Sequence, residues 1–121
     1  MGLDMYAFAT KEGLPAPVDF PAPEAEHLHQ WRKHPNLHGW MEELYRAKGG
    51  GQDSFNCVNI QLTADDLQIL EADIMASNLP STEGFFFGAS DGTELEDDLA
   101  FIAKARAAIA GNLSVYYTSW W

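Results

Sequence analysis

Leu3-Asp-Met-Tyr-Ala-Phe-Ala9, near the start of the chain, alternates between two kinds of side chain. Leu, Met and Ala occupy one set of positions, and Asp, Tyr and Phe occupy the positions between them. This alternation is typical of a β-strand, because successive side chains of a strand point to opposite faces of its sheet. We therefore expect residues 3–9 to open a sheet, with the aromatic side chains together on one face.

A proline-rich segment follows this strand. Residues 10–26 contain four prolines, and proline lacks the backbone donor that helices and sheets both use. We predict a surface loop over these residues that carries Val18 or Phe20 into the core. The next residues, His27 to Trp31, are expected to form a short second strand.

Three later segments have the features of helices. Between Pro35 and Lys48, apolar residues recur at spacings of three and four, and proline is well suited to a first helical turn. The segments 63–78 and 93–111 each begin with a threonine that precedes a carboxylate by three residues, which is a variant of the capping box. Apolar residues follow each threonine at helical spacing. We therefore predict helices over these three segments.

The remaining apolar segments favour strands. Residues 57–62 alternate apolar and polar side chains, Phe85-Phe-Phe87 stands between two glycines, and residues 113–118 close the pattern. Because helices separate the later strands, these strands can pair in parallel, while the first two are free to run antiparallel. The prediction is an α+β (mixed α/β) fold: a single domain over residues 1–121, with a mixed sheet of four or five strands and three helices.

Charge and composition limit the classes of partner. A chain of 121 residues suits one domain, since single cores commonly serve chains of roughly 100 to 150 residues. The formal net charge is −11, and residues 49–103 hold eleven carboxylates without a Lys or Arg. A phosphate backbone would be repelled by such a field, so nucleic acid is a poor candidate for a partner.

The cellular location is suggested by what the sequence lacks. The single cysteine, Cys57, leaves no internal disulfide, so nothing requires an oxidising compartment. The start of the chain lacks the pattern of a signal peptide, and no stretch approaches the roughly 20 apolar residues of a membrane span. We expect a cytoplasmic protein that does not enter a membrane.

A candidate ligand site lies where the second strand gives way to the first helix. Arg32 and Lys33 would join the free N–H groups and the positive end of that helix, where a small anion such as phosphate can bind. The alternative is that these two cations only offset the surplus of carboxylates.

The candidate site also includes Asp4, His38, Trp31 and Trp40. Asp4 interrupts an apolar run, so burying it unpaired would be costly, and its expected partner is Arg32, His38 or a backbone cap. Trp31 and Trp40 would supply apolar walls around a ligand.

Metal binding and nucleophilic catalysis have weaker signals. The histidines lie at positions 27, 29, 34 and 38, without a cysteine pair or the spacing of a known zinc motif. We therefore predict no metal and no cofactor. Cys57 beside His38 would be a nucleophile and its base, but a single cysteine in a strand is more often an inert, buried side chain.

The chain ends in Trp120 and Trp121. Two large apolar rings at a chain end are exposed unless they pack on the protein or on a partner. We therefore predict an interface here, through which the chain associates with itself or with another protein.

Five blocks of sequence, taken in order, resemble a known family. They are Met1-Gly-Leu-Asp-Met-Tyr6, Trp31-Arg-Lys33, the pair His38 and Trp40, Gly84-Phe-Phe-Phe-Gly88 and Tyr116-Tyr-Thr-Ser-Trp120. Together they are similar to small uncharacterised proteins encoded by bacteriophages, prophage regions and bacterial genomes. The resemblance implies a phage-linked cytoplasmic protein and no particular reaction.

Two functional hypotheses follow. The first is an accessory protein that binds another protein through its acidic and aromatic surface. The second is a binder of a small anionic ligand, or an enzyme, with its site around Arg32 and His38. No pairing of nucleophile and base is visible in the sequence, which favours the first hypothesis and a protein that is not an enzyme.

Overall fold

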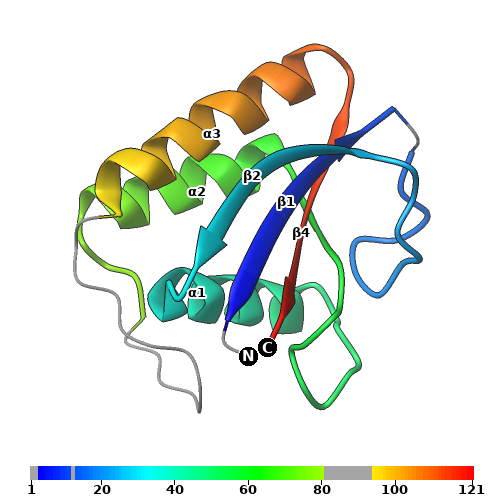
Figure 1. The fold of residues 1–121 in the computed structure, drawn as a ribbon, viewed down its shortest axis with the longest axis horizontal. Coiled ribbons are helices and arrows are strands. Elements are labelled where there is room, and N and C mark those ends of the chain that lie inside the picture. Colours follow the sequence, from blue (N-terminus) through cyan, green and yellow to red (C-terminus); the bar gives the residue numbers. More distant parts are fainter. Residues whose placement is uncertain (1–2, 12, 81–93) are drawn as a thin grey trace.

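The computed structural model describes residues 3–11, 13–80 and 94–121. Within them the helices and strands are, in chain order, β1 (Asp4–Thr10), β2 (Glu26–Arg32), α1 (Pro35–Ala47), β3 (Ile60–Leu62), α2 (Ala64–Met75), α3 (Leu95–Ala110) and β4 (Ser114–Trp120). The strands form one sheet, and the helices pack together as a second layer (Figure 1). The predicted α+β fold with three helices is confirmed for the described residues.

The sheet has the order β2-β1-β4-β3, and each of its pairs is antiparallel. The prediction of a mixed sheet with parallel later strands is therefore wrong for the described strands. Two helices, α2 and α3, separate β3 from β4 and pack against each other. A second helix reverses the chain once more than a single crossover helix does, so β4 enters the sheet antiparallel to β3. The strand predicted at Phe85-Phe-Phe87 lies outside the described residues.

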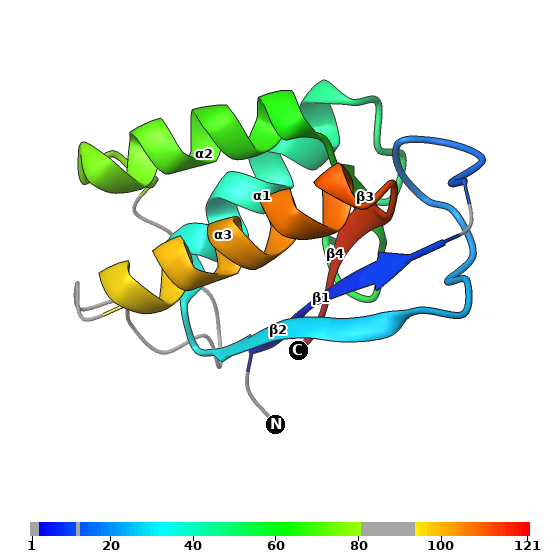
Figure 2. The same ribbon diagram turned by 90° about the horizontal axis from the view of Figure 1, so that it is seen from above.

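The helices cover one face of the sheet, and among the described residues the other face carries no helix, although Phe20 of the loop before β2 packs over its Tyr116 end. Figure 2 shows α1, α2 and α3 on the same side of β1, β2 and β4. Leu3, Met5 and Ala7 are completely buried, and they point toward the helices. Tyr6 and Phe8, at the alternate positions of the strand, are partly exposed on the other face. The predicted alternation of the first strand is therefore confirmed, including its shared aromatic face.

Local sequence signals placed the helix boundaries with different success. Thr63 caps α2 as predicted: its hydroxyl accepts the Asp66 N–H at 3.2 Å, and the Asp66 carboxylate accepts the Thr63 N–H at 2.9 Å. The helix α3 has Glu94 at its N-cap, without a hydrogen bond from that side chain to the helix end, and Thr93, where the sequence predicted the cap, lies outside the described residues. Between β1 and β2 the chain carries Val18 and Phe20 into buried positions, as the sequence predicted for one or the other.

None of the helices in the described part of the chain combines the length and the apolar character needed to cross a bilayer.

Candidate functional site

Asp4 and Arg32 meet across the β1–β2 ladder. Arg32 Nε lies 3.5 Å from Asp4 Oδ1, and both side chains are at least one third exposed. Of the three partners expected for Asp4, the structure shows Arg32, although an ion pair at this exposure contributes less than about 1 kcal/mol. Lys33 follows with a left-handed backbone (φ 56°), and its N–H donates to the Leu3 carbonyl at 2.8 Å.

His38 lies on the opposite side of the sheet, inside the helix-covered core. Its Nδ1 accepts the hydroxyl of Tyr117 at 2.7 Å, and its ring packs 4.8 Å from the ring of Phe55. Burial lowers the pKa of His38 to about 4, against a smaller, opposite effect of a backbone hydrogen bond with Phe55. The imidazole is therefore neutral at physiological pH.

Trp31 and Trp40 are also buried on the helix side. Trp40 Nε1 donates to Asp73 Oδ2 at 2.8 Å and so joins α1 to α2. The sheet lies between these rings and the pair of Asp4 with Arg32. The structure therefore does not bring the six predicted site residues into one pocket.

The uncovered face of the sheet carries a row of aromatic rings. Phe8 stacks between Tyr6 and Tyr116, with ring centroids 6.2 Å and 5.4 Å away. Phe20 packs edge-on against Tyr116, and both of these rings are buried. Trp120 lies on the same face, opposite Asp4, and is 68% exposed. We call this surface the open sheet face, defined by Asp4, Tyr6, Phe8, His27, Arg32, Tyr116, Thr118 and Trp120.

The two terminal tryptophans differ in environment. Trp121 Nε1 donates to the Phe55 carbonyl at 2.8 Å, and its backbone exchanges two hydrogen bonds with the Asn56 side chain. Trp121 is thus attached to its own chain. Only Trp120 of this pair presents most of its ring to solvent.

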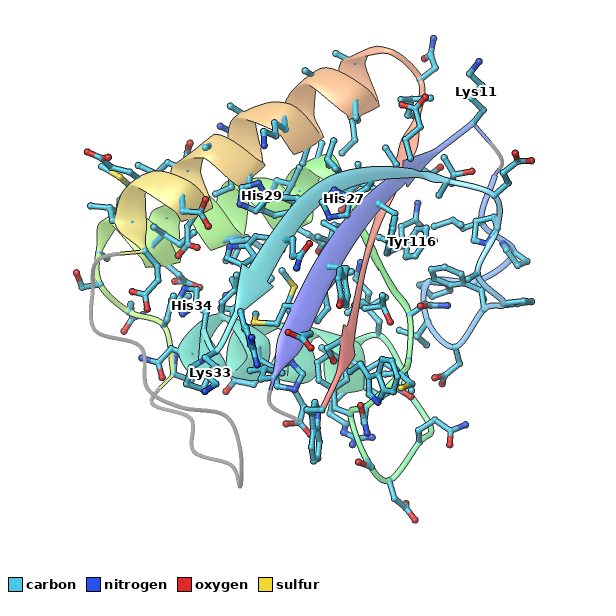
Figure 3. All side chains as sticks on the ribbon, viewed as in Figure 1. Lys11, His27, His29, Lys33, His34 and Tyr116 are labelled. Atoms are coloured by element: carbon cyan, nitrogen blue, oxygen red, sulfur yellow. The ribbon has the colours of Figure 1, made fainter. Side chains whose placement is uncertain are left out.

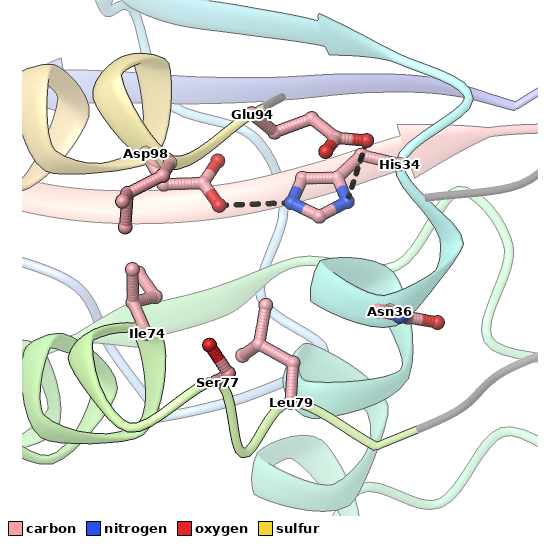
Figure 4. A pocket seen from close by; sticks show the side chains of 8 residues that line it. His34, Asn36, Ile74, Ser77, Leu79, Glu94 and Asp98 are labelled. Carbon is pink, nitrogen blue, oxygen red and sulfur yellow. Dashed lines mark hydrogen bonds and ion pairs between the residues drawn. The ribbon is translucent and has the colours of Figure 1, made fainter. Parts of the chain in front are cut away.

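A second feature is a pocket where the start of α1, the end of α2 and the start of α3 meet (Figure 4). Its volume is about 190 Å³. We call it the α1–α3 pocket, lined by His34, Asn36, Ile74, Ser77, Leu79, Glu94, Leu95 and Asp98.

A buried histidine and carboxylate form the floor of this pocket. His34 Nε2 lies 2.9 Å from Asp98 Oδ2, and the other oxygen of Asp98 accepts Trp31 Nε1–H at 3.0 Å. Since an ionised carboxylate only accepts hydrogen bonds, His34 Nε2–H is the donor in this contact. Glu94 Oε1 lies 3.8 Å from His34 Nδ1.

His29, on β2 (Figure 3), also contacts polar side chains of α3. Its Nε2 lies 3.1 Å from Asp97 Oδ1, and its Nδ1 lies 3.2 Å from Lys104 Nζ. Polar contacts therefore join β2 to α3 at two points, in addition to the contact of His38 on α1 with Tyr117 on β4.

Sequence reasoning placed His34 at the helix cap but missed its partners. A usable signal existed, because Asp98 precedes Phe101 and Ile102 by three and four residues and so falls on the buried stripe of its helix. A carboxylate on such a stripe requires a hydrogen-bond partner.

Cys57 is exposed, so the expectation of a buried cysteine is wrong. Its backbone is left-handed (φ 59°) and lies in a bend, and the Cys57 N–H donates to the Ser119 carbonyl. Within the described residues, no three His, Cys, Asp or Glu side chains are arranged to hold a metal ion.

Comparisons with models of protein families, with curated proteins and with solved structures find no match to this chain. The resemblance to phage-encoded proteins therefore stays a prediction.

Proposed function

We propose that the chain is a small phage-associated protein of the cytoplasm that binds a basic protein partner through the open sheet face. The phage setting is supported by the five sequence blocks alone. The binding role is supported by the geometry of the sheet.

The observation that carries this proposal is the exposed ring of Trp120 beside a helix-free aromatic surface. Tryptophan and tyrosine dominate the binding energy of many protein interfaces, because they bury a large area with few rotatable bonds. Tyr6 and Phe8 are already held in place by stacking, so little side-chain entropy would be lost on binding.

The charge of the chain favours a basic partner. A net charge of −11 attracts a positively charged surface over long range and raises its rate of association. The same charge opposes pairing of two copies of the chain. The small-anion alternative has less support, since Arg32 is paired with Asp4 and His38 lies beyond the sheet.

Isothermal titration with a purified partner tests the proposal. Trp120→Ala is expected to raise the Kd about tenfold or more, as truncation of an interface hot spot does. The matched control is Ile69→Ala on α2, whose side chain is 57% exposed in the helix layer. The control is expected to leave the Kd unchanged, and added salt is expected to weaken binding of the wild-type chain.

Two results would contradict the proposal. One is a partner that binds with equal Kd to the wild-type chain and to Trp120→Ala. The other is light scattering that shows a stable dimer which Trp120→Ala converts to a monomer, because the occupant of the face would then be a second copy.

A further inference from the structure

We propose that the outer edge of β2 receives an extended segment of a positively charged protein, which adds a further strand to the sheet. β2 is the outermost strand beside β1 (Figure 1). We call the outward backbone groups of Gln30 and Arg32 the β2 edge. This edge is the margin of the sheet and not its open face, so the inference does not depend on contacts of Trp120.

The alternation of hydrogen bonds decides which groups of β2 point outward. In an antiparallel pair, one residue bonds the neighbouring strand through both its N–H and its C=O, and both groups of the next residue point away. Lys33 N–H donates to the Leu3 carbonyl at 2.8 Å, in the register that places Arg32 opposite Asp4. Arg32 and Gln30 are therefore the residues whose N–H and C=O point away from β1.

The other side of β1 follows the same rule. Ser119 lies opposite Met5, whose backbone groups face β2 in this alternation. The Ser119 carbonyl accordingly points away from β1, where it accepts the Cys57 N–H at 2.8 Å. The orientation assigned to β2 is thus consistent with the hydrogen bonds across the rest of the sheet.

The two margins of the sheet differ in cover. Beside β3, the loop before β2 supplies backbone partners, since Gln61 N–H donates to the Pro17 carbonyl at 2.9 Å. At the β2 edge, no hydrogen bond within the described ranges joins the backbone of Gln30 or Arg32 to a residue beyond β1. Both residues are exposed. Two donors and two acceptors are therefore available to an added strand, which is the arrangement that β-augmentation uses.

The length of the available edge is limited at both ends. One extra residue on β2, Leu28, interrupts the register between His29 and His27. Lys33 has a left-handed backbone (φ 56°) and ends the strand at the other side. Because bulges and turns stop a ladder, the edge suits a short strand and resists extended edge-to-edge association.

Charge selects the occupant. The net charge of −11 attracts a positively charged segment over long range and opposes a second copy of the chain. Arg32 is 62% exposed, and like charges directly opposite each other on a ladder are destabilising. Basic residues of the added strand therefore belong at the positions that face the helix layer. Neutral polar residues belong at the positions that pair with Gln30 and Arg32.

A synthetic peptide with this pattern, acetyl-Lys-Thr-Lys-Thr-Lys-amide, tests the inference. It is titrated into the ¹⁵N-labelled chain and followed by nuclear magnetic resonance. Saturable shifts of the Gln30 and Arg32 amides and slower hydrogen exchange at both are expected. Absence of these shifts would overturn the inference.

Two N-methylated peptides of equal mass and charge show whether backbone pairing is responsible. Methylation of both threonines removes the two donors that face β2 and is expected to raise the Kd at least about tenfold. Methylation of the second and third lysines alters donors that point away from β2 and is expected to leave the Kd nearly unchanged. Equal Kd values would contradict strand addition, and the reverse order would contradict the assignment of the lysines to the helix side.

A matched pair of substitutions locates the contact on the chain. Gln30→Pro deletes the outward donor at an edge position, where a strand tolerates proline, and is expected to raise the peptide Kd at least about tenfold. Gln30→Thr changes the side chain but keeps the donor and is expected to leave the Kd unchanged. Equal Kd values in the two variants would place the peptide elsewhere. The N-methylated peptides test the same contact on the wild-type chain if Gln30→Pro does not fold.

The remaining controls distinguish other occupants. In the free chain, the Gln30 and Arg32 amides are expected to exchange faster than the Trp31 amide, and equally slow exchange would overturn the inference because the edge would already be covered. Light scattering that shows a dimer which Gln30→Pro converts to a monomer would overturn it in favour of a second copy. Equal affinity for acetyl-Glu-Thr-Glu-Thr-Glu-amide would contradict the basic partner. Trp120→Ala is expected to leave the peptide Kd unchanged, so failure here is separable from failure of the proposed function.

Discussion

Trp31 and Trp120 lie on two strands of one sheet and face opposite sides of it. Trp31, on β2, is 4% exposed and donates its indole N–H to Asp98, whereas Trp120, on β4, is 68% exposed. The helix-covered side therefore uses its aromatic and polar groups to join layers. The helix-free side presents the ring of Trp120 to solvent. The difference implies that substitutions on the covered side change stability, and that those on the open side change binding.

The largest effect is expected from Asp98→Ala. It would leave the Trp31 N–H and His34 without their shared acceptor inside the core, which destabilises a protein by about 3–5 kcal/mol when a buried pair is broken. Urea unfolding at pH 7 measures this free energy. Glu96→Ala, on the exposed side of the same helix, is the control and is expected to change it by less than about 1 kcal/mol. Equal losses in the two variants would show that the Asp98 contacts do not join the layers.

A smaller effect is expected from the protonation of His38. Its pKa is lowered from 6.5 to about 4 in the folded chain, so the unfolded chain takes up the proton first as the pH falls. Stability from this group is complete above pH 6.5 and is lost as the pH falls toward about 4. Between pH 7 and pH 5 the loss is about 2 kcal/mol.

The pH effect is isolated by comparison with His38→Phe, which cannot titrate. The other histidines and the carboxylates are common to both proteins, so their contributions largely cancel in the difference. The free energy of unfolding of the wild-type chain is expected to fall more steeply between pH 7 and pH 5. Parallel pH profiles would contradict a buried, neutral His38.

The smallest effect on stability is expected on the open sheet face. Trp120→Ala should change the free energy of unfolding by less than about 1 kcal/mol, because most of that ring is already in water. Trp31→Ala, across the sheet, is the contrasting variant and should cost about 3–5 kcal/mol. Thermal and urea unfolding of both variants measures the two changes in the free energy of unfolding. A larger loss in Trp120→Ala than in Trp31→Ala would contradict the prediction.

Much of the local structure could be predicted from residue patterns. The alternation in residues 3–9 located β1 and the face that carries Tyr6 and Phe8, and the Thr63 capping box located the start of α2. These features depend on neighbours within a few residues, so sequence spacing is enough to detect them.

The candidate sites could be predicted only in part. The pairing of Asp4 with Arg32 was expected, but the grouping of Arg32 with His38 was not realised, because Arg32 ends a strand on one face while His38 lies beneath the other. Asp98 is 64 residues from His34, and Tyr117 is 79 residues from His38. Contacts at such separations leave no periodic signal in the chain.

The sequence by itself determined the α+β class, the central strand and the acidic character of this protein, since these follow from composition and short-range periodicity. Only the tertiary structure decided the antiparallel order of the sheet, the exposure of Trp120 and the meeting of His34 with Asp98. The physical reason is that two packed helices set the direction in which the chain returns to the sheet. That direction determines which distant side chains share a face of the sheet and which lie on opposite faces.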